Sequence, residues 1–141
     1  MSEGLRRIDL QKAAEGKLRD AHLLVQNARF SSAYYLAGYT AEMGLKACIA
    51  RRMVQEVIPD KVFIQRTYTH ALKDLVGLAG LNAELEAEKA NDVEFGAYWG
   101  IAGQWTPNSR YASIDSMSAQ LMVQAIGDQK SGVLQWIKKY W

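Results

Sequence analysis

A row of small side chains in the segment from about residue 31 to 54 sets the first limit on the fold. Its members, spaced by three or four residues, are Ala33, Ala37, Ala41, Gly44 and Cys48. Residues at these spacings lie along closely related edges of an α-helix, and small side chains let a neighbouring helix approach the backbone closely. We therefore expect a helix here that packs tightly against another helix.

The preceding segment can supply that neighbour. From about residue 8 to 28, apolar residues recur at three- and four-residue steps with charged and polar residues between them, as in an amphipathic helix. Ser31 and Ser32 suit the start of the second helix, because a serine hydroxyl can accept a hydrogen bond from a first-turn N–H. The two helices are expected to form an antiparallel hairpin.

Three further helical segments follow. Thr69 can cap a short helix that ends near Gly80, where the backbone can adopt the left-handed conformation that stops a helix. A longer helix is expected from about 83 to 101, and a last helix can start at Ser113 or Asp115. No segment shows the alternating pattern of a strand.

Two places depart from regular helix. From about residue 55 to 68, around Pro59, the helical period is lost, so we expect a connection longer than the ~2 to 8 residues usual between bundle helices. Gly127 and Gly132 each cost the last helix about 1 kcal/mol relative to alanine, so it is expected to bend or break there unless packing compensates.

The predicted fold is all-α: an antiparallel bundle of four long helices plus one short helix. The 141 residues fit a single domain, 1–141, with its core at about 8–138. No stretch approaches the roughly 18 apolar residues of a membrane span, and the start lacks a secretory signal, so a cytoplasmic protein without membrane contact is expected. The single cysteine, Cys48, is expected in the core.

Charge and composition exclude several kinds of site. Seventeen Lys and Arg against fifteen Asp and Glu give a net charge of +2. This total is too small to indicate nucleic-acid binding, which must be argued from where the basic residues lie. The chain has no Gly-rich phosphate loop and no nucleophile elbow, and its two histidines lack metal-ligand spacing. We expect no metal and no cofactor.

One helical stripe in the second helix combines aromatic and charged residues: Tyr35, Tyr39, Glu42 and Lys46. If the stripe faces a cleft, Lys46 can meet a phosphate and a tyrosine can stack on a base. Alternatively, the tyrosines pack in the core or an interface, and Glu42 and Lys46 form a solvated ion pair of about 0.2 to 0.5 kcal/mol. Both interpretations remain open.

Arg110 and Tyr111 allow a similar pair of interpretations. They can contact a phosphate and a base from the turn in which they lie. Equally, the arginine can bond the carbonyls at a helix end while the tyrosine completes the core.

Three stretches of the sequence carry a family resemblance. The run from Ala33 to Ala47, AYYLAGYTAEMGLKA, is similar to the second helix of HEPN domains, with aromatic and small residues and an E-x-x-L-K-A ending. The stretch Thr69–Leu72 with Leu75 is similar to the family's T-H-x-L-x-x-L, and Arg110-Tyr111 is similar to its R-Y turn. The resemblance covers most of the chain, from about 10 to 138.

The resemblance implies a helical bundle that is commonly dimeric, with a cleft near the subunit interface. Members of the family bind nucleotides, cut RNA, or pair with small nucleotidyltransferases in two-component, toxin-antitoxin-like modules. On this basis we expect a homodimer that binds a nucleotide or RNA, with a nucleotidyltransferase as a partner protein. A purely structural dimerisation module is an alternative.

A metal-independent ribonuclease is a further alternative. RNA-cutting members of the family use an arginine followed by a histidine with four to six residues between them, and the nearest match is Arg66 and His70, with three between. A histidine can move a proton, and an arginine can stabilise charge growing on a phosphate. At this spacing the two side chains need not converge, and His70 can instead bond a backbone group or a side chain at a helix start.

Overall fold

The computed structural model describes residues 4–141, and over that range it contains eight α-helices, one 3-10 helix and no strand. The helices, in chain order, are α1 (Arg7–Gln26), α2 (Phe30–Arg52), α3 (Lys61–Arg66), α4 (Leu72–Leu78), α5 (Asn82–Asn91), α6 (Val93–Ala102), η1 (Pro107–Tyr111), α7 (Ser116–Gly127) and α8 (Val133–Lys138). The predicted all-α helical bundle is confirmed. No described helix combines the length and the apolar character needed to cross a membrane.

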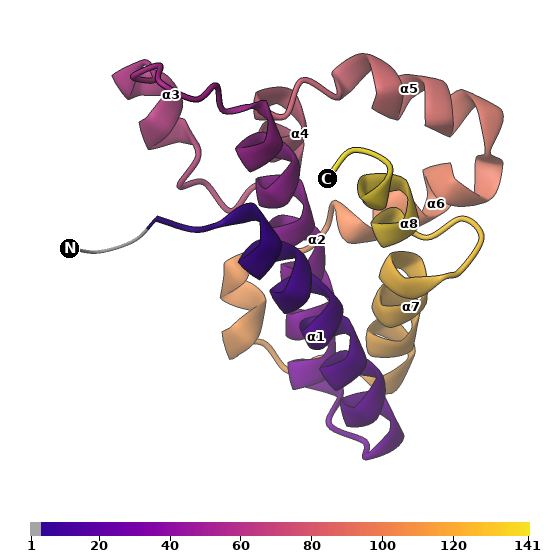
Figure 1. Ribbon diagram of the computed structural model, residues 1–141. Coiled ribbons are helices and arrows are strands. Elements are labelled where there is room, and N and C mark those ends of the chain that lie inside the picture. The colour runs from indigo at the N-terminus through magenta and orange to yellow at the C-terminus, as the bar shows by residue number, and fades with distance from the viewer. Residues whose placement is uncertain (1–3) are drawn as a thin grey trace.

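Helix α2 lies at the centre of the molecule, with other helices around it (Figure 1). It contacts α1 along its length and also meets α4, α7, α8 and η1. Its buried residues, which include Ala37, Gly38, Thr40, Glu42 and Ala47, are spread around the helix rather than along one stripe. A helix that is covered on most sides has this pattern.

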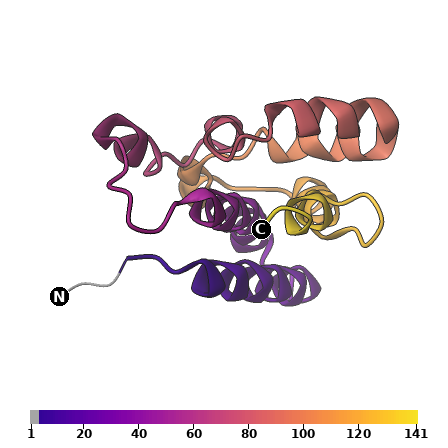
Figure 2. The same ribbon diagram turned by 45° about the horizontal axis from the view of Figure 1, so that its top comes forward.

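The first two helices form the predicted antiparallel hairpin and run side by side (Figure 2). The Thr40 hydroxyl of α2 is fully buried and lies 3.2 Å from the carbonyl oxygen of Ala14 in α1 and 3.1 Å from that of Leu36. A buried hydroxyl needs such partners, because an unsatisfied polar group inside the protein is destabilising.

The small residues of α2 make room for more than one neighbour. A Cβ atom on Gly44 would lie 2.9 Å from Cγ2 of Ile137 in α8, and the Cys48 thiol lies 3.7 Å from the Ile137 carbonyl oxygen. A Cβ atom on Gly38 would overlap the indole ring of Trp105. The row of small side chains therefore receives α8 as well as α1.

Two of the predicted long helices are divided. The predicted helix from 83 to 101 breaks at Asp92, whose carboxylate accepts a hydrogen bond from the Phe95 N–H, 3.1 Å away, and so caps α6. An aspartate can satisfy a helix start in this way and thereby compete with a continuous helix. The break predicted at Gly127 and Gly132 is present between α7 and α8.

The connection predicted from 55 to 68 contains a helix that the sequence pattern did not reveal. Helix α3 has six residues, and Asp60 caps it by accepting a hydrogen bond from the Phe63 N–H at 3.1 Å. Six residues are too few for a helical period to be recognised. None of the six is fully buried.

The predicted helix starts are confirmed in one case and corrected in two. Asp115 caps α7 by accepting from the Ser118 N–H at 2.7 Å. The predicted serine caps of α2 are wrong, because α2 begins at Phe30, no side chain caps it, and the Ser31 hydroxyl accepts instead from the Ile114 N–H at 2.9 Å. Thr69 lies before the capping position of α4 and accepts from the Ala71 N–H at 3.2 Å.

We predict that Gly38→Ala lowers the free energy of unfolding by about 1 to 3 kcal/mol, because the added Cβ would overlap Trp105. Gly100→Ala in α6 is the control, since nothing lies within 4 Å of its Cβ position. Helix propensity alone makes that control equally stable or up to about 1 kcal/mol more stable. Urea denaturation followed by circular dichroism measures both, and equal effects would contradict the close packing of Trp105 on α2.

Candidate functional site

One carboxylate lies inside the helical bundle. Glu42, in the middle of α2, is 2% exposed, and no other charged side chain within residues 4–141 is buried to this degree. Removing a carboxylate from water is strongly unfavourable unless charged or hydrogen-bonding partners go with it. The two partners of Glu42 therefore define the site.

Lys46 is the first partner. Its Nζ lies 3.3 Å from Oε2 of Glu42, one helical turn earlier on α2, and its side chain is mostly buried. The interpretation of Glu42 and Lys46 as a solvated surface pair is therefore wrong, because the carboxylate is enclosed. An ammonium has three N–H donors, and only one of them is needed for this contact.

His70 is the second partner. It lies in the connection before α4, and its Nδ1 is 2.9 Å from Oε1 of Glu42. An ionised carboxylate can only accept, so the tautomer that suits this contact has the proton on Nδ1 and the lone pair on Nε2. The His70 side chain is 54% exposed.

The Glu42–His70 contact can do two things. It holds the connection between α3 and α4 against α2. It also orients an imidazole whose second nitrogen can exchange a proton with a molecule at the surface, as a carboxylate orients the histidine in known acid–base catalysts.

Arg66, the other residue of the proposed ribonuclease pair, lies at the last position of α3 and is exposed. In the part of the chain that the structure describes, no hydrogen bond or ion pair joins it to His70. The structure thus gives His70 a carboxylate partner rather than an arginine partner.

The tyrosines of the stripe lie further along α2. The rings of Tyr35 and Tyr39 are stacked with their centroids 5.8 Å apart, and Trp105 lies 6.0 Å from the first and 6.3 Å from the second. The Trp105 Nε1–H donates to the Tyr35 carbonyl oxygen at 3.1 Å. Burial, followed by the nearby charge of Glu42, raises the pKa of Tyr39.

Arg110 and Tyr111 extend this aromatic group. The Arg110 guanidinium carbon lies 4.8 Å from the centre of the Tyr111 ring. Hydrogen bonding to Tyr111, and to a smaller extent to Tyr35, raises the pKa of Arg110. Tyr111 is 77% exposed, so it does not complete the core. This turn presents a cation and an aromatic ring to solvent.

The structure therefore brings together residues from three segments of the chain on one side of α2. Tyr39 connects the two ends of this group, because its ring stacks on Tyr35 and it lies one helical turn before Glu42 on α2. We call the group the α2 face, and its members are Tyr35, Tyr39, Glu42, Lys46, His70, Arg110 and Tyr111. Four of them form the stripe predicted from the sequence, and the other three were predicted separately. Trp105, which packs against Tyr35 and Tyr39, was not among the predicted site residues.

Cys48 is a core residue, as predicted. It is buried, and desolvation raises the pKa of its thiol to about 12. Such a thiol is a poor nucleophile, because the thiolate is the reactive form.

Neither a metal centre nor a known relative explains the α2 face. Over residues 4–141, no three His, Cys, Asp or Glu side chains lie close enough together to hold a metal ion. Comparisons of the chain with protein-family models, with curated proteins and with solved structures found no match.

We predict that Glu42→Gln lowers the free energy of unfolding by about 1 to 3 kcal/mol, because buried contacts to Lys46 and His70 are weakened. Glu86→Gln is the matched control: it removes an exposed pair with Lys89, 3.1 Å away, and should change stability by less than about 0.5 kcal/mol. Chemical denaturation measures both. Similar losses in the two variants would show that burial of Glu42 has no special role.

We predict that the Cys48 thiol of the folded protein resists alkylation at about pH 8, where its raised pKa makes the thiolate fraction about a thousandfold smaller than in the unfolded chain. The raised pKa also contributes to the stability of the fold. This contribution is fully present below pH 9.0 and is lost as the pH rises toward about 12. Mass spectrometry of iodoacetamide-treated protein, with and without urea, measures the difference. Rapid labelling without urea would contradict the burial of the thiol.

Proposed function

We propose that this chain is a HEPN-like module that binds a nucleotide or a segment of single-stranded RNA on the α2 face. The observation that carries the proposal is the buried carboxylate of Glu42, which holds Lys46 and His70 beside a group of partly exposed aromatic rings. These residues belong to the three stretches that resemble HEPN domains. Their meeting on one side of α2 supports the family proposal.

The cations of the α2 face suit phosphate. Lys46 is held by Glu42 and still has N–H donors to offer, while Arg110 is exposed and lies over an aromatic ring. Ammonium and guanidinium groups are the usual protein ligands of phosphate oxygens. The face therefore combines two phosphate-binding groups with one imidazole.

The aromatic rings of the α2 face suit bases. Tyr35 and Tyr39 are partly exposed and Tyr111 is largely exposed. Stacking of a base on an aromatic side chain contributes about 1 to 3 kcal/mol and tolerates any base. This arrangement favours a ligand that carries both bases and phosphates.

The family resemblance adds a homodimer and a nucleotidyltransferase partner to this proposal. A dimer requires an apolar contact surface, and Met117 and Leu121, one turn apart on α7, are exposed apolar residues that suit one. A cytoplasmic location is part of the same proposal.

A second candidate function is metal-independent RNA cleavage. The Glu42–His70 contact favours it, because it orients the imidazole with Nε2 free to accept a proton. In this hypothesis Arg66 or Arg110 would stabilise the charge on the phosphate.

Binding is tested by fluorescence anisotropy with a labelled mixed-sequence RNA pool, and by competition with nucleoside triphosphates. Tyr111→Leu should weaken RNA binding by about 5- to 100-fold through lost stacking, and Arg110→Gln should also weaken it. Lys130→Gln, at an exposed position in the turn between α7 and α8, is the control and should change affinity by less than about twofold. Wild-type protein that binds neither RNA nor nucleotides would refute the proposal.

The same mixtures, analysed on a gel after incubation with a chelator, separate binding from cleavage. RNA that is cut by wild-type protein but not by His70→Ala would establish the second candidate function. RNA that stays intact with bound wild-type protein would leave binding as the function.

A further inference from the structure

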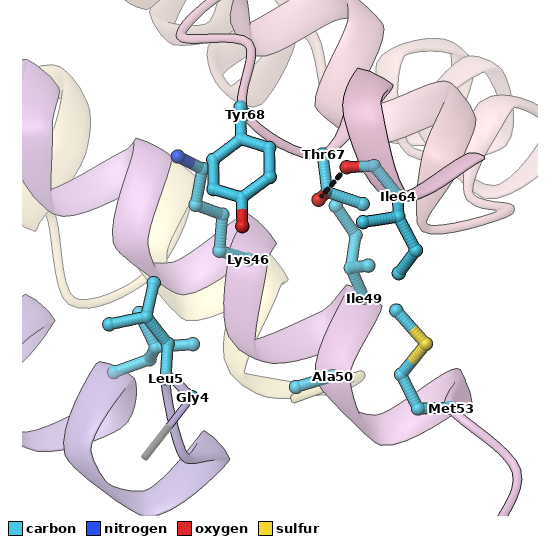
Figure 3. A pocket seen from close by; sticks show the side chains of 10 residues that line it. Gly4, Leu5, Lys46, Ile49, Ala50, Met53, Ile64, Thr67 and Tyr68 are labelled. Atoms are coloured by element: carbon cyan, nitrogen blue, oxygen red, sulfur yellow. Dashed lines mark hydrogen bonds between the residues drawn. The ribbon is translucent and has the colours of Figure 1, made fainter. Parts of the chain in front are cut away.

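A cavity of about 470 Å³ lies beside the α2 face, between α2, α3 and the residues that lead into α1. Figure 3 shows Lys46 and Tyr68 on one side of it and Met53 and Ile64 on the other, with Leu5 closing the end near α1. The volume lies in the range of about 300 to 1,000 Å³ that is typical of small-molecule sites.

Most side chains around the cavity are apolar. Leu10 and Ile49 form its inner part, and Leu5, Met53 and Ile64 form much of the remainder. Leu5 and Met53 are exposed, and Tyr68 at the mouth is 73% exposed. Apolar groups that surround an open hollow gain free energy when an apolar ligand covers them.

The polar side chains around the cavity can all donate a hydrogen bond. Lys46 and Tyr68 line the cavity, and Figure 3 marks no hydrogen bond from the Tyr68 hydroxyl to the other residues drawn. The Thr67 hydroxyl already donates to the Ile64 carbonyl oxygen at 2.6 Å. Among the residues that the structure describes, 4–141, no carboxylate lines the cavity. The side-chain groups open to a ligand are therefore an ammonium and a phenol, both of which can donate.

We propose that this cavity binds a small organic anion, made of an apolar body and a single acid group such as a carboxylate, sulfonate or phosphate monoester. The apolar body packs against Leu10, Ile49 and Met53. The acid group accepts hydrogen bonds from Lys46 and Tyr68 at the rim, where charge-assisted hydrogen bonds are strong. This site shares Lys46 with the α2 face but contains none of its stacking tyrosines, so it does not require that RNA or a nucleotide binds there.

The site also reaches the buried carboxylate. Lys46 lies 3.3 Å from Glu42, and Glu42 contacts His70, so an acid group at Lys46 competes with Glu42 for the same ammonium. Occupation of the cavity is therefore coupled to the contact that positions the imidazole.

The test uses two probes of similar shape: anilinonaphthalene sulfonate, which carries one acid group, and the neutral phenylnaphthylamine. Wild-type protein should bind one sulfonate probe per chain, with the neutral probe about tenfold weaker or more. Lys46→Met keeps most of the apolar stem. It should lower the affinity for the sulfonate probe by about tenfold and change the affinity for the neutral probe by less than about twofold. Ala50→Phe, which fills the cavity, should abolish binding of both.

Ile58→Ser is the control, because Ile58 is 96% exposed and lies outside the cavity. Its affinity for each probe should stay within about twofold of the wild-type value. Equal affinity of the two probes, unchanged sulfonate binding in Lys46→Met, or unchanged binding in Ala50→Phe would each overturn the proposal. Folding of each variant is checked by circular dichroism, and Ala50→Phe keeps the Glu42–Lys46 pair intact.

Competition then identifies the acid. Displacement of the probe by decanoate assigns a carboxylate ligand, and displacement by phenyl phosphate assigns a phosphate monoester. The cavity proposal and the RNA-binding proposal can be tested separately. Ala50→Phe should abolish probe binding while keeping RNA affinity within about twofold of the wild-type value. Arg110→Gln should weaken RNA binding while keeping probe affinity within about twofold.

Discussion

The enclosure of α2 by other helices is the constraint from which the rest of the structure follows. A helix with neighbours on most sides needs small residues where a neighbour comes close, as Trp105 does at Gly38 and Ile137 does at Gly44. The same enclosure leaves one side of α2 on which polar and aromatic groups can reach solvent. The functional candidates are there because the other sides are occupied.

Enclosure also explains the chemistry of Glu42. A carboxylate on a surrounded helix must carry its own partners, and Lys46 from the same helix and His70 from a distant segment fulfil that requirement. Each partner then gains a defined position from a group that is itself buried. A structural need and the proposed role in ligand binding are thus met by the same three side chains.

The parts of the fold that depend on local periodicity could be predicted from the sequence. The hairpin of α1 and α2 and the shared face of Tyr35, Tyr39 and Lys46 follow from helix geometry, and the cap at Asp115 follows from its side-chain chemistry. The burial of Glu42 could not be foreseen in this way, because it depends on a histidine 28 residues away in sequence. The break at Asp92 was missed because an aspartate is compatible both with a continuous helix and with a new start.

Helix α3 has a consequence for how the molecule moves. It is a single short helix with no fully buried residue, and isolated helices of such length are unstable in water. The free energy needed to detach it is therefore only a small part of that needed to unfold the whole domain. Because α3 forms one wall of the cavity, molecules can enter and leave by local opening of this wall while the bundle around α2 stays intact.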